Sequence, residues 1–315
     1  MKIADIAIKG KVFLAPMAGV NDLAFRVLCK KYGSALNFTE MVNVNGVERK
    51  NKSTIKLAYT LDEEKPVAVQ LFGTRISAIK STIKILETDE NVKPVIFDFN
   101  FGCPVKRIMN QGAGSALLKR PSKIGEIINA MRESTDLAVS AKIRLGISPK
   151  NSNYMKTAKI IEKNGADMLI VHGRYQSQGY SGKADWEKIK EIKESLNIPV
   201  VGNGDVADEV SAKKMLEQTK CDYLMIGRAS MGNPFIFSRI NHYLDTGKIL
   251  QQKNKLELFL EYLELAKKYK VKSSIIKMQA MYFTKGVEGS AKLRDKLSSI
   301  YDLSDICEIF KSHSC

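Results

Sequence analysis

The chain has 315 residues, of which 50 are Lys or Arg and 34 are Asp or Glu, so its formal net charge is 50 − 34 = +16 at pH 7. A single core stops growing near ~250 to 300 residues, so the length fits one large domain or one large and one small domain. The basic excess favours a polyanionic partner, with a solubilising Lys-rich surface as the plainer alternative.

The cysteines are odd in number and widely spaced, without a C-x-x-C pair or a Cys/His cluster of metal-ligand spacing. They are Cys29, Cys103, Cys221, Cys307 and Cys315. We therefore expect a reducing, cytoplasmic location and no metal site. Charged residues interrupt the apolar ones at the start of the chain, and no segment approaches the ~18 uninterrupted apolar residues of a membrane span, so we expect neither a signal peptide nor a membrane anchor.

Eight short apolar segments bounded by turn residues recur along the first three quarters of the chain. They begin near residues 12, 35, 66, 95, 138, 167, 198 and 222. Amphipathic stretches at 122–134, 154–166 and 186–197 lie between some of them and predict helices. Apolar strands that alternate with helices predict an α/β fold with a parallel sheet covered on both faces. Eight such units predict a closed (β/α)₈ TIM barrel rather than an open doubly wound sheet.

The strand pattern stops near residue 240. Residues 255–270, 273–287 and 290–310 predict three helices, after a connector at 241–254. We therefore expect a catalytic barrel over residues 1–240 and a small all-helical domain over residues 241–315. Its aromatic side chains are expected mainly in its own core, although a basic helical appendage also suits a macromolecular substrate.

Polar residues gather where the predicted strands end, which is where barrels of this kind hold their active sites. They are Gln70, Asn100, Cys103, Lys142, Arg144, His172, Arg174, Asn203, Asp205 and Arg228.

The segment VVGNGDVADEV contains the spacing G-x-G-x-x-A at residues 202–207, which also occurs in dinucleotide-binding Rossmann folds. It follows the seventh strand rather than the first, and Asp205 would repel a pyrophosphate, so an NAD-dependent Rossmann dehydrogenase is disfavoured. Loops after the seventh and eighth strands of a barrel commonly bind one phosphate through backbone N–H groups. Gly204 and Arg228 fit such a site, and Lys142, Gln70 and His172 could face a flat heterocycle, which favours flavin mononucleotide (FMN).

Several motifs together resemble the tRNA-dihydrouridine synthase family, most closely its bacterial-type B-like branch. The matching segments are APMAGVNDLAFR, TEMV, VQLFG, DFNFGCPVKRIMNQGAGSALLKRP, AKIRLG, VHGR, GYSGKADW, IPVVGNGDV and IGRASMGNP, with YFTKGVEGSAKLR as a looser match in the tail. The resemblance implies an FMN enzyme that reduces a uridine of tRNA to 5,6-dihydrouridine with NADPH or NADH as reductant. It implies no membrane partner, and we expect a monomer.

The resemblance also assigns roles to residues. The implied FMN contacts are Pro16, Met17, Ala18, Gln70, Lys142, His172, Asn203, Gly204, Asp205, Gly227 and Arg228. The implied substrate contacts are Asn100, which would touch the uracil, and the cations Arg144 and Arg174. Cys103 matches the proton donor of the family.

The proposed chemistry suits a thiol. Reduction of the uracil double bond needs a hydride at carbon 6 and a proton at carbon 5. A thiol with an ordinary pKa of ~8.5 is mostly protonated at neutral pH, so Cys103 can supply that proton. Lys106 and Arg107 would favour the thiolate if they pointed inward, and we expect them to face solvent or RNA phosphate.

The chain departs from the family pattern in two places. Tyr175 and Gln176 follow the HGR segment where the family has Thr and Arg, and Lys277, Met278 and Gln279 replace an Arg-Lys-His run in the tail. Both departures bear on RNA contacts. Two other functions remain open at this point: an FMN enzyme of the dihydroorotate or dihydropyrimidine dehydrogenase type that acts on a free pyrimidine, and an RNA-binding barrel without catalysis.

Overall fold

The computed structural model describes residues 2–299, 305–306 and 308–310, and its centre is a sheet of eight parallel strands. The strands are β3 (Val12–Leu14), β4 (Asn37–Asn43), β5 (Val67–Phe72), β6 (Ile96–Phe101), β7 (Ala138–Arg144), β8 (Met168–His172), β9 (Val200–Asn203) and β10 (Tyr223–Ile226). Each pairs with its neighbours in the spatial order β3-β10-β9-β8-β7-β6-β5-β4. A bridge between Phe13 and Leu36, and a 3.0 Å hydrogen bond from the Leu14 amide to the Leu36 carbonyl, close the ring. The predicted closed α/β barrel is confirmed.

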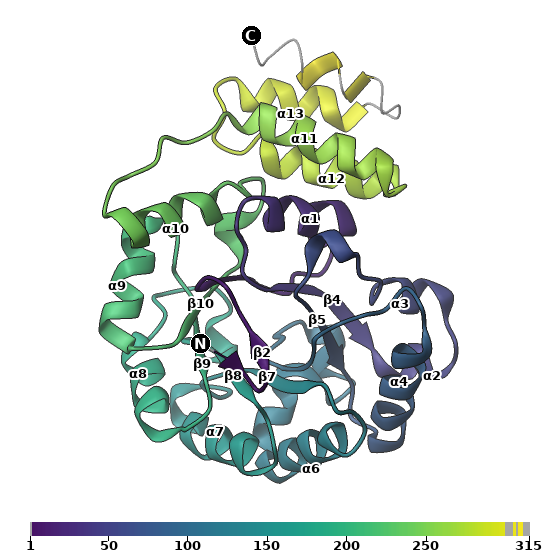
Figure 1. The fold of residues 1–315 in the computed structure, drawn as a ribbon, viewed down its shortest axis with the longest axis vertical. Helices are drawn as coiled ribbons and strands as arrows, with labels where there is room; N and C mark the ends of the chain where they lie inside the picture. The colour runs from purple at the N-terminus through teal and green to yellow at the C-terminus, as the bar shows by residue number, and fades with distance from the viewer. Residues whose placement is uncertain (1, 300–304, 307, 311–315) are drawn as a thin grey trace.

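Helices surround the strands on the outside (Figure 1). They are α1 (Leu23–Lys31), α2 (Val44–Glu48), α3 (Lys52–Lys56), α4 (Ile76–Thr88), α5 (Lys106–Met109), α6 (Pro121–Arg132), α7 (Tyr154–Lys163), α8 (Trp186–Ser195), α9 (Glu209–Thr219) and α10 (Ile236–Thr246). Short 3₁₀ turns are η1 (Asp62–Glu64), η2 (Gly114–Lys119), η3 (Pro149–Asn151), η4 (Gln176–Gln178) and η5 (Arg228–Ser230). The helices predicted at 122–134, 154–166 and 186–197 are confirmed as α6, α7 and α8.

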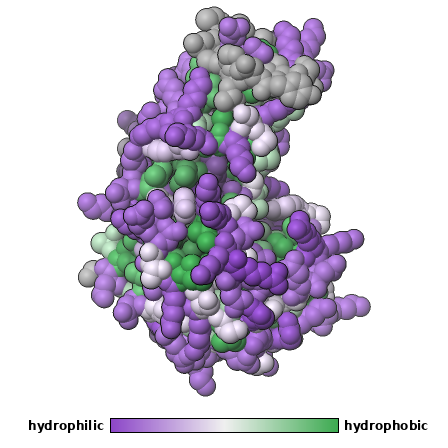
Figure 2. Space-filling model, turned by 90° about the vertical axis from the view of Figure 1, so that its right-hand side faces the viewer, coloured by the Kyte–Doolittle hydropathy of each residue, from purple (hydrophilic) through white to green (hydrophobic). Residues whose placement is uncertain are grey.

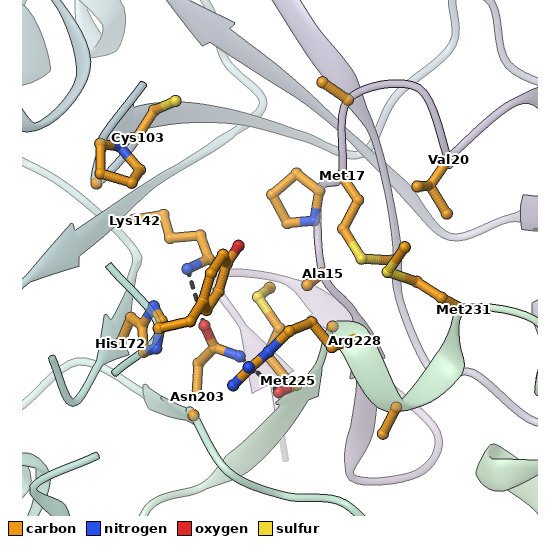
Figure 3. Close-up of a pocket in the computed structure, with 18 of the residues that line it drawn as sticks. Ala15, Met17, Val20, Cys103, Lys142, His172, Asn203, Met225, Arg228 and Met231 are labelled. Carbon is orange, nitrogen blue, oxygen red and sulfur yellow. Dashed lines mark hydrogen bonds between the residues drawn. The ribbon is translucent and has the colours of Figure 1, made fainter. Parts of the chain in front are cut away.

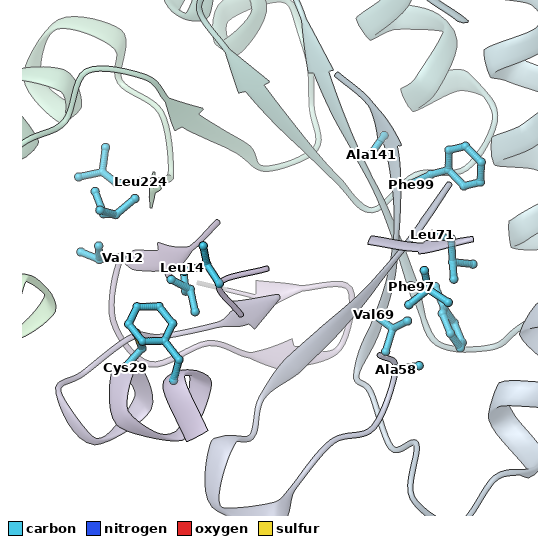
Figure 4. Close-up of a cluster of buried hydrophobic side chains, with 14 of the residues drawn as sticks. Val12, Leu14, Cys29, Ala58, Val69, Leu71, Phe97, Phe99, Ala141 and Leu224 are labelled. Atoms are coloured by element: carbon cyan, nitrogen blue, oxygen red, sulfur yellow. The ribbon is translucent and has the colours of Figure 1, made fainter. Parts of the chain in front are cut away.

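Alternate strand residues divide into an inner and an outer core, as the two-residue period of a strand requires. Val69, Leu71, Phe97 and Phe99 belong to the outer cluster, which the helices cover (Figure 4). Residues of the opposite parity fill the barrel interior from all eight strands. They include Phe13, Phe38, Ala68, Ile96, Ala138, Met168, Val201 and Tyr223. The same alternation directs the polar residues near the strand ends to the inside of the barrel.

The amino-terminal end of the barrel is closed by a hairpin of β1 (Lys2–Ile3) and β2 (Ile6–Ala7). Ile3 and Ile8 are buried in the inner cluster together with residues at the beginnings of the strands. The opposite end, where the strands finish, remains available for a site.

The tail forms α11 (Lys255–Lys268), α12 (Ser273–Phe283) and α13 (Ser290–Ser299). These helices lie above α1 and α10 in Figure 1. Part of the third predicted helix, residues 300–304 and 307, lies outside the described residues. The predicted connector is wrong over residues 241–246, because α10 continues to Thr246 and ends at Gly247, whose φ is 70°. That left-handed conformation is typical of a glycine that terminates a helix.

Buried hydrogen bonds anchor the tail to the loop between β3 and α1. The Gln279 amide donates to the Val20 carbonyl at 2.7 Å and to Asp22 Oδ2 at 3.0 Å, and the Tyr262 hydroxyl bonds the same carboxylate oxygen at 3.2 Å. Asp22 also accepts the Phe25 amide and so caps the start of α1. The departure at Gln279 is therefore part of the contact between tail and barrel.

The face in Figure 2 is mainly hydrophilic, with small hydrophobic patches scattered over it. Across the described residues, no helix is both long enough and apolar enough to cross a membrane.

Candidate active site

A cavity of about 770 Å³ opens where the barrel strands end. Every predicted site residue except Gln70 and Arg174 lines it. Those that do are Pro16, Met17, Ala18, Asn100, Cys103, Lys142, Arg144, His172, Asn203, Gly204, Asp205, Gly227 and Arg228. In Figure 3, Cys103 and Lys142 approach the cavity from one side and Met17 and Arg228 from the other.

The loop after β3 supplies an apolar wall. Pro16, Met17 and Ala18 line the cavity, and the Met17 carbonyl accepts the amides of Val20 at 3.2 Å and Asn21 at 3.1 Å. The buried Asn21 side chain in turn donates to backbone carbonyls on two neighbouring segments. This turn is therefore fixed from behind, and its apolar side is left to face a ligand.

Lys142, near the end of β7, carries an ammonium into the cavity. Its Nζ donates to Asn203 Oδ1 at 2.9 Å, and Asn203 in turn donates to the Met225 carbonyl at 2.8 Å (Figure 3). The pKa of Lys142 is lowered to about 8, mainly by burial and to a smaller extent by the charge of Arg144, while Asp98 and Cys103 oppose the shift. The site thus holds an ammonium that an anionic ligand would stabilise in its charged form.

His172 ends β8 beside this lysine. Burial lowers the pKa of its imidazole far below the usual value, and the charges of Lys142, Arg144, Arg174 and Arg228 lower it further. The ring is therefore neutral at physiological pH and can take part in hydrogen bonds with a ligand without adding charge.

The loops after β9 and β10 form one rim of the cavity. A Cβ on Gly204, whose φ is 119°, would lie 2.8 Å from the Ala184 side chain and 3.0 Å from the His172 ring. Asp205 also has a positive φ, of 59°, which Asp tolerates better than most residues. Glycine is therefore required at position 204, where the backbone packs closely against Ala184 and His172 and also lines the cavity.

Arg228 faces this rim with a half-exposed guanidinium. It lies 3.4 Å from Asp205 Oδ1 and 4.4 Å from the centre of the Tyr180 ring. These contacts hold the guanidinium in place while leaving donors for an anion.

Cys103 lies in the turn after β6, half-buried at the cavity wall. Its amide donates to Asn100 Oδ1 at 2.8 Å, and its carbonyl accepts the Ser115 hydroxyl at 2.8 Å and the Ser115 amide at 3.0 Å. Burial raises the pKa of the Cys103 thiol, against smaller opposing effects of the Val105 amide, Arg144 and Lys142. The thiol is accordingly protonated at neutral pH.

Lys106 and Arg107 are exposed to solvent, as predicted, and neither contributes to the shift of the Cys103 pKa. The cations that do act on the thiol are Arg144 and Lys142. Arg144 donates to the carbonyls of Gly102, Tyr175 and Gly179, so it joins the Cys103 turn to the loop after β8.

Gln70 is not among the residues that line the cavity, and its contact with a flavin stays a prediction. The side chain is fully buried below the cavity, where Nε2 donates to Asp98 Oδ2 at 2.7 Å and Oε1 accepts from Asn100 at 2.8 Å.

Arg174 is also not among the lining residues, and its contact with the substrate stays a prediction. It is 2% exposed, forms an ion pair with Asp205 at 2.7 Å and donates to the carbonyls of Ser181 and Gly182. Its guanidinium therefore holds the loops after β8 and β9 together instead of facing the cavity.

The cavity residues that the sequence did not single out as site residues include Tyr180, Tyr282 and Lys285. Tyr180 is 59% exposed, and its ring lies between Arg228 and Arg144, whose guanidinium is 5.9 Å from the ring centre. An aromatic residue in the glycine-rich GYSG segment was an available signal. Tyr282 and Lys285 come from the tail, and no local pattern indicated that the tail reaches the cavity.

A family model described as dihydrouridine synthase matches residues 13–313, which is nearly the whole chain. The chain belongs to the dihydrouridine synthase family. The resemblance noted from the motifs is thereby confirmed, and the match includes the tail as well as the barrel.

Curated relatives agree with this membership of the dihydrouridine synthase family. A probable tRNA-dihydrouridine synthase of Rickettsia bellii is 34% identical over 309 residues, covering 96% of this chain and 94% of that protein. The tRNA-dihydrouridine synthase B of Proteus vulgaris is 38% identical over 251 residues, covering 79% of this chain and 76% of that protein.

Solved structures of lower identity share the fold of this dihydrouridine synthase family member. A 2-naphthoyl-CoA reductase matches with a TM-score of 0.61 at 13% identity, and a histamine dehydrogenase from Rhizobium with 0.60 at 14% identity. The matches cover 79% and 84% of this chain, but only 52% and 50% of those chains. They support the barrel architecture alone.

Proposed function

We propose that this protein reduces a uridine of tRNA to 5,6-dihydrouridine with a flavin bound in the cavity. The observation that carries the proposal is a protonated thiol, Cys103, in a cavity that also holds the Lys142 ammonium and the Arg228 guanidinium. Membership of the dihydrouridine synthase family supports the same reaction.

FMN fits the residues present. The apolar loop of Pro16, Met17 and Ala18 would cover the flat ring, and Lys142 would face its polar edge. The backbone at Gly204, together with Arg228, would hold the single phosphate. When bound and reduced, the flavin supplies the hydride that carbon 6 of the uracil receives.

Cys103 would donate the proton to carbon 5. The burial that raises its pKa keeps the proton on sulfur until the base arrives, and Lys142 and Arg144 favour the thiolate that remains. The proton and the hydride together convert the double bond to a single bond. NADPH or NADH would then return the flavin to its reduced state.

The RNA would reach the site through the open mouth of the cavity. A target base must leave its stack to enter, at a cost of a few kcal/mol that phosphate contacts offset. The net charge of +16 supplies such contacts, and Tyr282 and Lys285 bring the tail to the mouth. We therefore assign RNA binding to the tail, residues 241–315, in addition to the rim of the barrel.

Anaerobic reoxidation of the flavin distinguishes this function from the two alternatives. The protein is loaded with FMN, reduced with NADPH and mixed separately with unmodified tRNA, free uracil and orotate. We expect tRNA to reoxidise the flavin and the free pyrimidines to leave it reduced. Turnover of a free pyrimidine but not of tRNA would instead favour the free-pyrimidine enzyme, and absence of flavin binding would favour a non-catalytic RNA-binding barrel.

A further inference from the structure

A chain of hydrogen bonds links the closed interior of the barrel to the Cys103 turn. It starts at Asp98 on β6, a fully buried carboxylate that does not line the cavity. Asp98 Oδ1 accepts the Ser140 hydroxyl at 2.6 Å, and Oδ2 accepts Gln70 Nε2 at 2.7 Å. Gln70 Oε1 then accepts Asn100 Nδ2 at 2.8 Å, and Asn100 Oδ1 accepts the Cys103 amide at 2.8 Å.

The order of donors and acceptors along this chain follows from its first member. An ionised carboxylate only accepts hydrogen bonds, so Gln70 must turn its NH₂ group toward Asp98. The Gln70 carbonyl oxygen then faces Asn100, so Asn100 must donate to it through its NH₂ group. The Asn100 oxygen is consequently left to accept the amides of Gly102 at 3.1 Å and Cys103 at 2.8 Å.

This order of donors and acceptors requires Asp98 to be ionised at neutral pH. Burial raises its pKa to about 6, while bonds from Ser140 and Gln70 and the charge of Lys142 oppose the rise. Asp98 is therefore mainly ionised at neutral pH. Lys142 is the charged group that acts on it, and Ser140 and Gln70 are its direct partners.

Side chains from two residues, Asn100 and Ser115, hydrogen-bond to the backbone of Gly102 and Cys103 in this turn. Ser115 fixes the Cys103 carbonyl, and Asn100 fixes the amides of Gly102 and Cys103. If the Asn100 amide were reversed, its NH₂ group would face those two N–H groups and the turn would lose its acceptor. A displacement of a reacting group by about 1 Å can slow a reaction by about 10²-fold.

We propose that Asp98 is a positioning residue for the reaction: through Gln70 and Asn100 it sets the orientation of the amide that holds the Cys103 turn. The inference rests on the proposed function in that Cys103 is the proton donor. It gives Gln70 and Asn100 a role in aligning the thiol, separate from any contact with flavin or uracil.

The test is a double-mutant cycle on tRNA reduction. Asp98→Asn keeps the shape but replaces one of the two acceptor oxygens with an NH₂ donor, so the side chain no longer dictates which end of the Gln70 amide faces it. We expect kcat to fall by about 10- to 100-fold with unchanged KM for tRNA and an unchanged rate of flavin reduction by NADPH. In a Cys103→Ala background, where the thiol is already absent, Asp98→Asn should cause no further loss.

Ser140→Ala removes the buried hydroxyl that donates to Asp98, and Thr82→Val is its matched control. Thr82 lies on the outer helix α4, where its buried hydroxyl donates to the Val44 carbonyl at 3.0 Å. Thr82→Val should leave kcat unchanged. Ser140→Ala, which removes one donor to Asp98, should cause a smaller loss with the same dependence on Cys103, and it carries the test if Asp98→Asn does not fold.

The outcomes separate this inference from the proposed function. If the wild-type protein reduces tRNA but Asp98→Asn and Ser140→Ala leave kcat unchanged, Asp98 is not a positioning residue. If Asp98→Asn lowers kcat by the same factor in the wild-type and Cys103→Ala backgrounds, the inference is also overturned, because Asp98 would then act independently of the thiol. Failure of the wild-type protein to reduce tRNA would overturn the function itself.

Discussion

Gln279→Ala should loosen the tail from the barrel. Gln279 is fully buried on α12, and its NH₂ group donates both to the Val20 carbonyl and to the Asp22 carboxylate. Val20 lines the cavity, so the same amide connects the tail to the loop that we assign to the flavin.

The magnitude follows from the bonds that are lost. The bond to a carboxylate contributes about 1.5 to 3 kcal/mol and the bond to a carbonyl about 0.5 to 1.5 kcal/mol. Among the described residues the Gln279 carbonyl oxygen has no hydrogen-bond partner, so its removal returns about 1 to 3 kcal/mol. Taken at their central values, these contributions leave an expected net loss in the free energy of unfolding of about 1 kcal/mol.

Urea unfolding followed by circular dichroism measures this loss. Gln251→Ala is the matched control, because Gln251 is exposed on the connector, and it should change stability by only a few tenths of a kcal/mol. Equal effects of the two substitutions would refute the reasoning, because the buried amide would then contribute nothing to the attachment of the tail.

Three further predictions concern the cavity. Cys103→Ala should lower tRNA reduction by about 10²- to 10⁴-fold while flavin and tRNA binding persist, which single-turnover kinetics and a binding titration check. Arg228→Ala should weaken FMN binding by about 10- to 100-fold without weakening riboflavin binding, since riboflavin lacks the phosphate; equal losses would contradict the assignment. In flavin-free protein, Lys142 should become reactive toward an acylating reagent as pH rises through about 8, where it loses its proton, and mass spectrometry would show protection by FMN.

Much of the fold was predictable because the barrel repeats one local pattern. The strands are mainly apolar, and the last inward residues of several are polar, as in Lys142 and Arg144 on β7 and His172 on β8. The two-residue period alone placed these side chains inside the barrel, and the motif order placed Cys103 and Arg228 at the same end.

The exceptions depend on contacts between distant segments. Gln70 has the parity of an inward residue, but its depth below the cavity depends on Asp98 and Asn100 from the next strand. Arg174 follows a strand like a ligand-binding residue, yet Asp205, 31 positions later, pairs with it. The reach of Tyr282 into the cavity depends on how the tail packs, which no local periodicity encodes.

The most direct test of the central claim is mass spectrometry of nucleosides from tRNA treated with the purified protein. Unmodified tRNA is incubated with the protein, FMN and NADPH, and then digested and mapped. The account predicts that uridine at defined positions gains two hydrogen atoms and that Cys103→Ala greatly reduces this product. Unchanged uridine in every tRNA tested, with FMN bound and reduced, would contradict it.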